Sequence, residues 1–187
     1  ALVTALPLAA DEMKANFDDA KPGELPAGWE SGSFGDKAAP HWQVIADQDA
    51  PSKPNVLRQD GKTVYGYLVD RSPTIKNGAV SAKFKIQSGK EDPEAGIIMR
   101  FVDGKNYYYV RANSLEDNIV FYRMSGGEKK AIKTVDIAVP ENQWHDLRVE
   151  FRDLDFKVWF KGKELFSAKD STIKDGGGSG VWTTADT

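Results

Sequence analysis

Polar and aromatic side chains alternate between Arg100 and Asn118, and their types suit hydrogen bonding and ring stacking. Arginine and asparagine offer oriented donors and acceptors for hydroxyl or carboxylate groups, while a tyrosine ring presents a flat apolar face. Such a set can hold a ligand with both polar groups and an apolar face, as a sugar ring has. The candidate binding residues are Arg100, Tyr107, Tyr109, Arg111, Asn113 and Asn118.

The same alternation has a purely structural interpretation. A sheet whose second face is covered by loops can also carry tyrosines with arginines stacked on them. We favour ligand binding over this alternative, because no other part of the chain gathers residues suited to recognition.

A β-hairpin must position these residues. The turn Asp103-Gly104-Lys105-Asn106 predicts that Val102 pairs with Tyr107, and period-2 geometry then separates two faces. The core face is expected to hold Ile97, Met99, Phe101, Tyr108, Val110 and Ala112. The opposite, candidate binding face is expected to hold Ile98, Arg100, Val102, Tyr107, Tyr109, Arg111 and Asn113.

Three carboxylates are candidates for catalysis, but all fall in expected loops. Glu94 closes the acidic run Glu91-Asp92-Pro93-Glu94, and Glu116 and Asp117 lie in the next turn. We favour the interpretation that such acidic clusters are solvent-exposed turn residues. His41 and His145 are too few and too unremarkably placed to indicate a triad or a zinc site, and His145 fits a hydrogen-bonded position on a buried face.

Asp18 and Asp19 are the candidate metal ligands. Together with a loop carbonyl they could bind calcium, although one dipeptide supplies too few oxygen ligands to define a site. We therefore expect no required cofactor, with calcium as the alternative.

The remaining chain predicts an all-β antiparallel sandwich or barrel. Val80, Ala82, Phe84 and Ile86 alternate with polar residues, which is typical of a half-buried antiparallel strand. A later hairpin is predicted in register, because pairing Phe151 with Phe156 also places Arg148 opposite Trp159. Turn signals separate about a dozen short strands, and no repeat or linker divides residues 11–187, which we expect to form a single domain.

Composition limits the possible partners. The net charge of −3 argues against nucleic acid, whose phosphates require a basic surface. No apolar run approaches the roughly 18 to 20 residues that a membrane-spanning helix needs. Residues 1–10, an apolar stretch ending in small residues before Asp11, have neither strand alternation nor a helical stripe. We interpret them as the remainder of a secretory signal and expect a secreted or periplasmic protein.

Four segments resemble a known group: NYYYVRANSLEDNIVFYR (106–123), WHDLRVEF (144–151), FKVWFKGKELF (156–166) and GVWTTADT (180–187). The chain resembles the concanavalin A-like lectin and glucanase superfamily, specifically laminin-G-like bacterial exported domains related to 3-keto-disaccharide hydrolase-like domains. The resemblance covers residues 75–187 well and the earlier chain loosely. It implies a jelly-roll sandwich of two curved antiparallel sheets, with carbohydrate as the usual ligand class and the concave sheet as the usual site.

The resemblance also bears on catalysis. Glycosidases of the related family carry Glu-x-Asp-x-x-Glu on one strand, which places two carboxylates at the retaining separation of about 5 to 5.5 Å. No expected strand of this chain has that pattern. Our preferred hypothesis is an exported carbohydrate-binding or glycan-processing domain. The alternatives are a glycoside hydrolase with loop-borne carboxylates and a laminin-G-type protein-interaction module.

Overall fold

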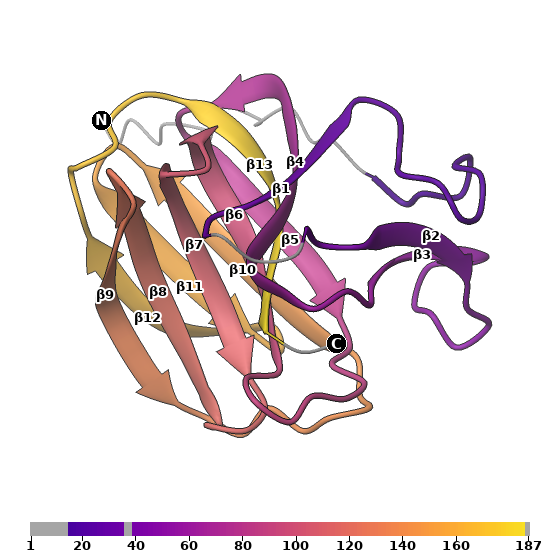
Figure 1. Cartoon of the computed structure of the whole chain (residues 1–187). Helices are drawn as coiled ribbons and strands as arrows, with labels where there is room; N and C mark the ends of the chain where they lie inside the picture. The colour runs from indigo at the N-terminus through magenta and orange to yellow at the C-terminus, as the bar shows by residue number, and fades with distance from the viewer. Residues whose placement is uncertain (1–14, 36–38, 186–187) are drawn as a thin grey trace, which may run out of the picture.

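The structure, a computed structural model, describes residues 15–35 and 39–185 (Figure 1). These residues form thirteen β-strands and no α-helix, and every strand pair is antiparallel. Within them, no helix is long and apolar enough to cross a membrane. The predicted all-β antiparallel class is confirmed. Residues 1–10, interpreted as a signal remainder, lie outside the described part of the chain.

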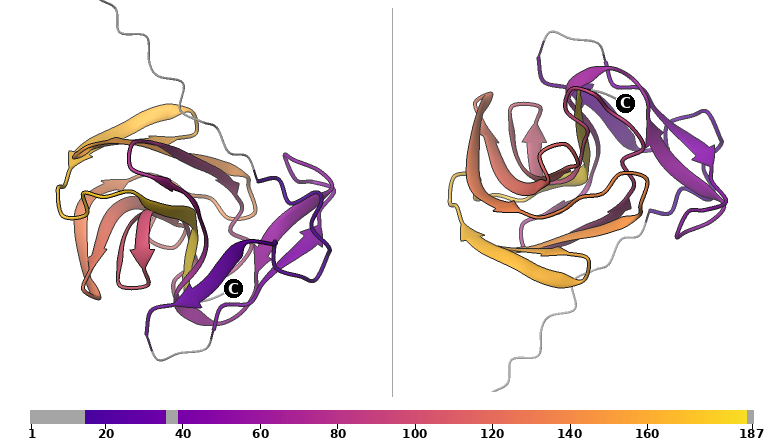
Figure 2. Two further views of the ribbon diagram at one scale, coloured as in Figure 1. Left: turned by 90° about the horizontal axis from the view of Figure 1, so that it is seen from above. Right: turned by 90° about the horizontal axis from the view of Figure 1, so that it is seen from below.

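Seven strands form the larger sheet, and the C-terminal strand lies near its middle. In spatial order they are β1 (Trp29–Ser33), β4 (Thr63–Ile75), β13 (Gly177–Ala185), β6 (Glu94–Asp103), β7 (Asn106–Asn113), β8 (Asn118–Ser125) and β9 (Glu128–Asp136). Figure 2 shows that this sheet is bent into a trough, whose hollow side faces away from the other sheet.

Two smaller sheets complete the fold. The second layer of the sandwich consists of β12 (Lys163–Lys169), β11 (Asp155–Phe160), β10 (His145–Arg152) and β5 (Gly78–Phe84). A separate hairpin pairs β2 (Trp42–Ala46) with β3 (Asn55–Gln59). The predicted register of β10 and β11 is confirmed: Phe151 is opposite Phe156, and Arg148 is opposite Trp159, with its guanidinium carbon 6.0 Å from the indole centroid.

The main core lies between the two layers. Tyr108 and Phe121 from the larger sheet meet Phe156 from the smaller one, with ring centroids 4.8 and 4.7 Å from the Phe156 ring. All three are fully buried. His145 is also buried, and its Nε2 donates to the Pro140 carbonyl at 2.8 Å, so the predicted hydrogen-bonded buried histidine is confirmed.

A bulge in β6 changes which face two residues occupy. The Asp103–Asn106 turn forms as predicted, but the register shifts between Met99 and Asp103, and Arg100 adopts a φ of 49°. A left-handed residue inside a strand reverses the alternation of the side chains beyond it. The prediction that Arg100 shares a face with Tyr109 is therefore wrong, and so is the assignment of Phe101 to the core between the sheets. Phe101 instead packs on the trough side with Tyr107.

Candidate functional site

Aromatic rings from three strands line the bottom of the trough. Tyr109 of β7 lies at the centre, with its ring centroid 4.5 Å from that of Trp182 in β13 and 5.0 Å from that of Tyr122 in β8. Both neighbours are stacked on Tyr109, at interplanar angles of 26 and 14°. Tyr109 and Trp182 are buried, whereas Tyr122 is partly exposed. The stack thus runs from the interior of the trough to its surface.

A second group of rings covers part of this stack. Tyr65 lies on Trp182 with centroids 6.0 Å apart, and Phe34 lies on Tyr65 at 6.4 Å. The Nζ of exposed Lys129 is 5.1 Å from the Tyr65 centroid and 5.2 Å from the Tyr122 centroid. We call Phe34, Tyr65 and Tyr122 the outer aromatic tier, because these rings are partly exposed and lie over buried ones. This tier is the aromatic surface that a ligand can reach.

A polar group borders the stack at one end of the trough. Its centre is Arg111, whose Nε lies 2.6 Å from Oε1 of Glu94 and whose Nη2 lies 2.8 Å from Oε2 of Glu116. Nη1 donates to Oδ1 of Asn118, and Nη2 also donates to the Tyr122 hydroxyl at 3.4 Å. We call Glu94, Arg111, Asn113, Glu116 and Asn118 the Arg111 cluster.

The cluster has a buried end and an exposed end. The side chains of Glu94 and Arg111 are only 5 and 6 % exposed, whereas that of Glu116 is 52 % exposed. Fully buried Asn113 donates to Glu94 Oε1 at 3.0 Å, and its own Oδ1 accepts the backbone amides of Leu115 and Glu116. Asn113 therefore fixes the turn that carries Glu116, and Glu116 and Asn118 are the most exposed members of the cluster.

The two glutamates are in opposite electrostatic states. Burial raises the pKa of Glu94 to about 7, although the positive charge of Arg111 opposes the rise. The hydrogen bond from Arg111 lowers the pKa of Glu116 below its usual value. Burial, with the nearby Glu94 charge as a smaller contribution, raises the pKa of Tyr109. One guanidinium therefore contacts a carboxyl that can hold a proton near neutral pH and a carboxylate that stays ionised.

The structure brings most, but not all, of the predicted site residues together. Tyr107, Tyr109, Arg111, Asn113 and Asn118 share the trough side with the candidate catalytic residues Glu94 and Glu116. Glu94 begins strand β6, so the prediction that it lies in a loop is wrong. Tyr107 and Tyr109 are fully buried, and the Arg111 guanidinium is held by protein groups. These three residues support the reachable surface from beneath.

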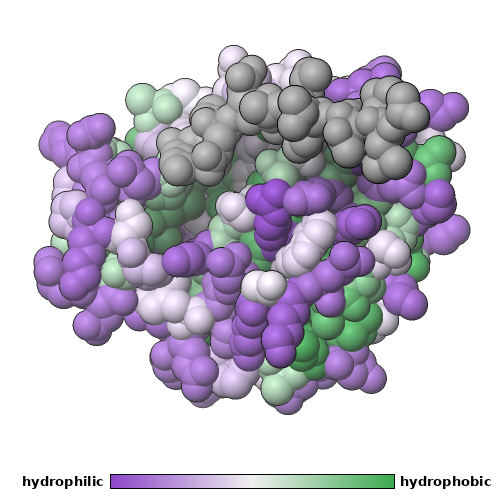
Figure 3. Space-filling view, turned by 180° about the vertical axis from the view of Figure 1, so that it is seen from behind, coloured by the Kyte–Doolittle hydropathy of each residue, from purple (hydrophilic) through white to green (hydrophobic). Residues whose placement is uncertain are grey.

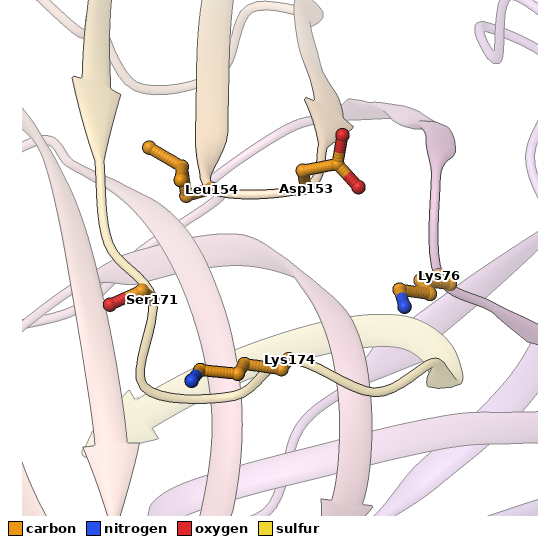
Figure 4. Close-up of a pocket in the computed structure, with 5 residues that line it drawn as sticks. All are labelled: Lys76, Asp153, Leu154, Ser171 and Lys174. Atoms are coloured by element: carbon orange, nitrogen blue, oxygen red, sulfur yellow. The ribbon is translucent and has the colours of Figure 1, made fainter.

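Arg100 lies on the other side of the larger sheet, where it joins three loops. Its guanidinium and Nε donate to the carbonyl oxygens of Lys76 at 3.0 Å, Ile173 at 2.9 Å and Asp153 at 2.7 Å. A small pocket of about 220 Å³ opens beside these loops, lined by Lys76, Asp153, Leu154, Ser171 and Lys174 (Figure 4). Its volume is below the roughly 300 Å³ of ordinary small-molecule sites. Arg100 thus holds three loops together at the end of the sandwich.

The other predicted residues have local structural contacts. Asp117 is exposed, and its Oδ1 accepts the Val139 amide at 2.9 Å. Asp18 accepts the Asn55 amide at 3.3 Å, and Asp19 is exposed. Among residues 15–35 and 39–185, no group of three or more His, Cys, Asp or Glu side chains is placed to hold a metal ion. Asp18 therefore ties its loop to β3.

Four residues of the site were not predicted: Phe34, Tyr65, Lys129 and Trp182. Tyr65 and Trp182 lie on expected strands, but their contact with Tyr109 depends on β13 inserting between β4 and β6. Such a non-local order leaves no local pattern in the sequence. The alternation of Tyr65, Tyr67 and Val69 was the one available signal, since it marks an aromatic-rich strand face.

Two packed antiparallel sheets, the larger one bent into a trough, define a jelly-roll β-sandwich. The carbohydrate-binding module CBM66 of Bacillus subtilis has a similar fold, with a TM-score of 0.63 and 16% identity over 86% of this chain and 96% of that one. A glycoside hydrolase family 16 endo-glucanase from Bacteroides ovatus gives a TM-score of 0.63 at 11% identity, covering 87 and 83% of the two chains. A β-glucanase of Bacillus licheniformis gives 0.57 at 12%, covering 88 and 82%.

The sequence itself matches no protein-family model and no curated protein. At such low identities the similarity establishes the fold, and the fold predicted by resemblance is confirmed.

Proposed function

We propose that this chain is a carbohydrate-binding sandwich domain whose ligand lies in the trough of the larger sheet. The observation that carries the proposal is the continuity of the Trp182–Tyr109–Tyr122 stack with the Arg111 cluster, which places flat apolar rings directly beside oriented polar groups. Similarity to a carbohydrate-binding module and to glucanases supports this ligand class over a laminin-G-type protein partner.

The exposed residues of the trough would make two kinds of contact with a glycan, apolar contacts and hydrogen bonds. The partly exposed ring of Tyr122 offers apolar surface for the C–H groups of a sugar ring, and Tyr65, stacked with Trp182 and Phe34, extends the aromatic surface beside it. Glu116 and Asn118 present a carboxylate and an amide at the border of these rings, and Lys129 adds a donor above them. Hydroxyl groups of a glycan need such paired donors and acceptors. Export of the protein remains a prediction from the sequence.

Binding to a panel of glycans tests the proposal. The panel should include mixed-linkage β-glucan, because one similar structure is a Bacteroides ovatus family 16 enzyme of a mixed-linkage glucan locus. We expect retention of at least one glycan in an affinity gel. Binding should be about tenfold weaker for Tyr122→Ala, since an aromatic contact contributes about 0.5 to 1.5 kcal/mol beyond its buried area and about 1.4 kcal/mol is a factor of ten.

The matched control is Trp159→Ala. Trp159 is a partly exposed aromatic residue on the outer face of the smaller sheet, stacked with Arg148. Its loss should leave glycan retention unchanged. Equal retention by Tyr122→Ala and the parent would rule out the trough as the binding surface, and equal weakening by both variants would indicate non-specific adhesion.

A second candidate function, glycan hydrolysis, is favoured by the contact of two carboxyl groups, those of Glu94 and Glu116, with the one guanidinium of Arg111. Glu94, with its pKa raised to about 7, has the property of a general acid, and ionised Glu116 has that of a base or nucleophile. Release of reducing ends from the same panel tests this role. Glu94→Gln and Glu116→Gln should each abolish release, whereas Asp117→Asn, next to Glu116 in the same turn, should retain it. Absence of release by the parent would reject hydrolysis of those glycans while leaving binding to be judged separately.

A further inference from the structure

The two edges of the seven-stranded sheet meet across the trough. One edge is β1, next to β4, and the other edge is β9. Phe34, which directly follows β1, packs against Gly127 in the turn between β8 and β9, where a Cβ atom on the glycine would lie only 2.8 Å from Cζ of Phe34. Lys129 of β9 reaches in the opposite direction, with its Nζ 5.1 Å from the ring centroid of Tyr65 in β4. Side chains from opposite edges thus cross the trough.

The residues beneath this crossing show that the trough is filled there. Tyr107, Tyr109 and Met124 lie on the trough side of the sheet, apart from the core between the sheets, and yet all three are fully buried. Side chains on the floor of an open trough would be exposed to water. Tyr67 of β4 also reaches the β6–β7 turn, where a Cβ atom on Gly104 would lie 3.0 Å from its hydroxyl oxygen. Protein atoms thus close this part of the trough.

The polar groups of the site lie on one side of the crossing. The Arg111 cluster is placed where β7 ends and β8 begins, whereas Gly127 belongs to the turn at the other end of β8. Tyr122 connects the two regions: its hydroxyl accepts a hydrogen bond from Nη2 of Arg111 at 3.4 Å, and its ring centroid lies 5.2 Å from Nζ of Lys129. The surface between the crossing and the cluster is therefore short, with one partly exposed ring bordered by polar groups.

A larger hollow of the molecule does not extend the trough. It is a cleft of about 1660 Å³ between β5 and the β2–β3 hairpin, and Val181 of β13 is among the residues that line it. Figure 3 shows a hollow with apolar residues on the face seen from behind. Val181 precedes Trp182, whose side chain belongs to the trough stack, so the two side chains lie on opposite faces of β13. The cleft thus offers no way through the closed part of the trough.

We propose that the trough binds a glycan by the end of its chain and not along an internal stretch. The proposal rests on the function proposed above. A sugar chain that contacts the Arg111 cluster and Tyr122 next meets Phe34 and Lys129, where the contact between the two edges leaves no path for further sugars. The terminal sugar stacks on Tyr122 beside the crossing, and the rest of the chain leaves past the Arg111 cluster. The ligand class is thus the terminus of an oligosaccharide or polysaccharide.

The binding capacity of a glycan before and after partial cleavage tests the proposal. The probes are mixed-linkage β-glucan and every other polymer of the panel that the parent retains, each as the intact polymer and as fragments of the same total mass. Binding at chain ends predicts that doubling the number of ends doubles the protein bound at saturation. Equal capacity for polymer and fragments would overturn the proposal but leave the binding function of the trough intact. Retention of no glycan would overturn the binding function and this inference together.

A double variant tests the crossing itself. Phe34→Ala/Lys129→Ala removes both crossing side chains, so the intact polymer should bind at internal stretches and its capacity should rise toward that of the fragments. The matched control is Trp159→Ala/Lys130→Ala, because Trp159 lies on the outer face of the smaller sheet and Lys130 lies on the opposite face of β9 from Lys129. The control should keep the parent's ratio of the two capacities. The parent's ratio in a double variant with the parent's urea midpoint would overturn the role of the crossing.

Discussion

The Nε of Arg111 lies 2.6 Å from Oε1 of Glu94, and the two side chains are almost inaccessible to water. They join β6 to β7 at the end of the trough, and Asn113 adds a hydrogen bond to the same carboxylate oxygen. Removing either side chain would leave the other buried without its hydrogen-bond partner, which is strongly destabilising. The site is thus coupled to the stability of the sheet through this pair.

The raised pKa of Glu94 predicts a pH-dependent stability. Its carboxyl has a pKa of about 7 in the folded chain and 4.5 as its ordinary value, so between these values the folded state binds more protons than the unfolded state. The free energy of unfolding should therefore fall as pH rises through this window, by up to about 3 kcal/mol from this group. Urea titrations from pH 4.5 to 7.5 should show this decline in the parent but not in Glu94→Gln. The same decline in both would contradict the assignment.

Two substitutions of Tyr109 should change the free energy of unfolding in different ways. Its hydroxyl is buried and has no hydrogen-bond partner among the described residues. Tyr109→Phe removes a buried hydroxyl that makes no hydrogen bond, so the free energy of unfolding should stay the same or rise by about 1 kcal/mol. Tyr109→Ala removes the centre of the stack and should cost about 3 to 5 kcal/mol. Urea unfolding measures both, and a loss of more than about 1 kcal/mol in Tyr109→Phe would show that the hydroxyl is paired.

Substitution of Arg100 should lower the stability of the fold without weakening glycan binding. Three backbone carbonyls accept its hydrogen bonds, and its guanidinium carbon lies 5.5 and 5.3 Å from the centroids of Phe151 and Phe156. Arg100→Met would leave these carbonyls unpaired, at an expected cost of about 2 to 5 kcal/mol. Glycan retention measured well below the unfolding midpoint should match the parent. Reduced retention by a folded Arg100→Met would instead restore Arg100 as a ligand contact.

Asn55 holds the loop around residues 16–20 through its side-chain amide. Its Nδ2 donates to the carbonyl oxygens of Phe17 at 3.1 Å and Asp18 at 3.3 Å. Asn55→Asp keeps the shape but removes both donors, so we expect a destabilisation of about 1 to 2 kcal/mol. Limited proteolysis should cut near residues 16–20 faster in this variant. An unchanged cleavage rate would mean that Phe17 packing against Trp29, with centroids 5.7 Å apart, suffices to hold the loop.

The sequence predicts local pairing well and long-range order poorly. The Phe151–Phe156 hairpin was predicted in full, because apolar and charged pairs agree on one register. The Asp103–Asn106 turn was also correct, yet Arg100 was assigned to the wrong face. Nothing in the residue types between Met99 and Asp103 signals the bulge, because its left-handed residue is an arginine and not a glycine.

The candidate site shows the same limit. Arg111, Asn113 and Asn118 come from one hairpin and its following turn, so their proximity could be predicted. The burial of Tyr109 could not, because it results from rings supplied by β4 and β13, strands far away in the sequence.

The outer aromatic tier rests on buried rings without belonging to the core between the sheets. Phe34 follows β1, and Tyr65 lies in β4 with a φ of 50°, so both come from the early part of the chain. Two of the three rings of the proposed binding surface therefore lie outside the core between the sheets, whereas the third, Tyr122, is next to the core residue Phe121 in β8. If the trough binds a glycan as proposed, replacing Phe34 or Tyr65 would change its preference while the β10–β11 hairpin and the Tyr108–Phe156 core continue to specify the sandwich.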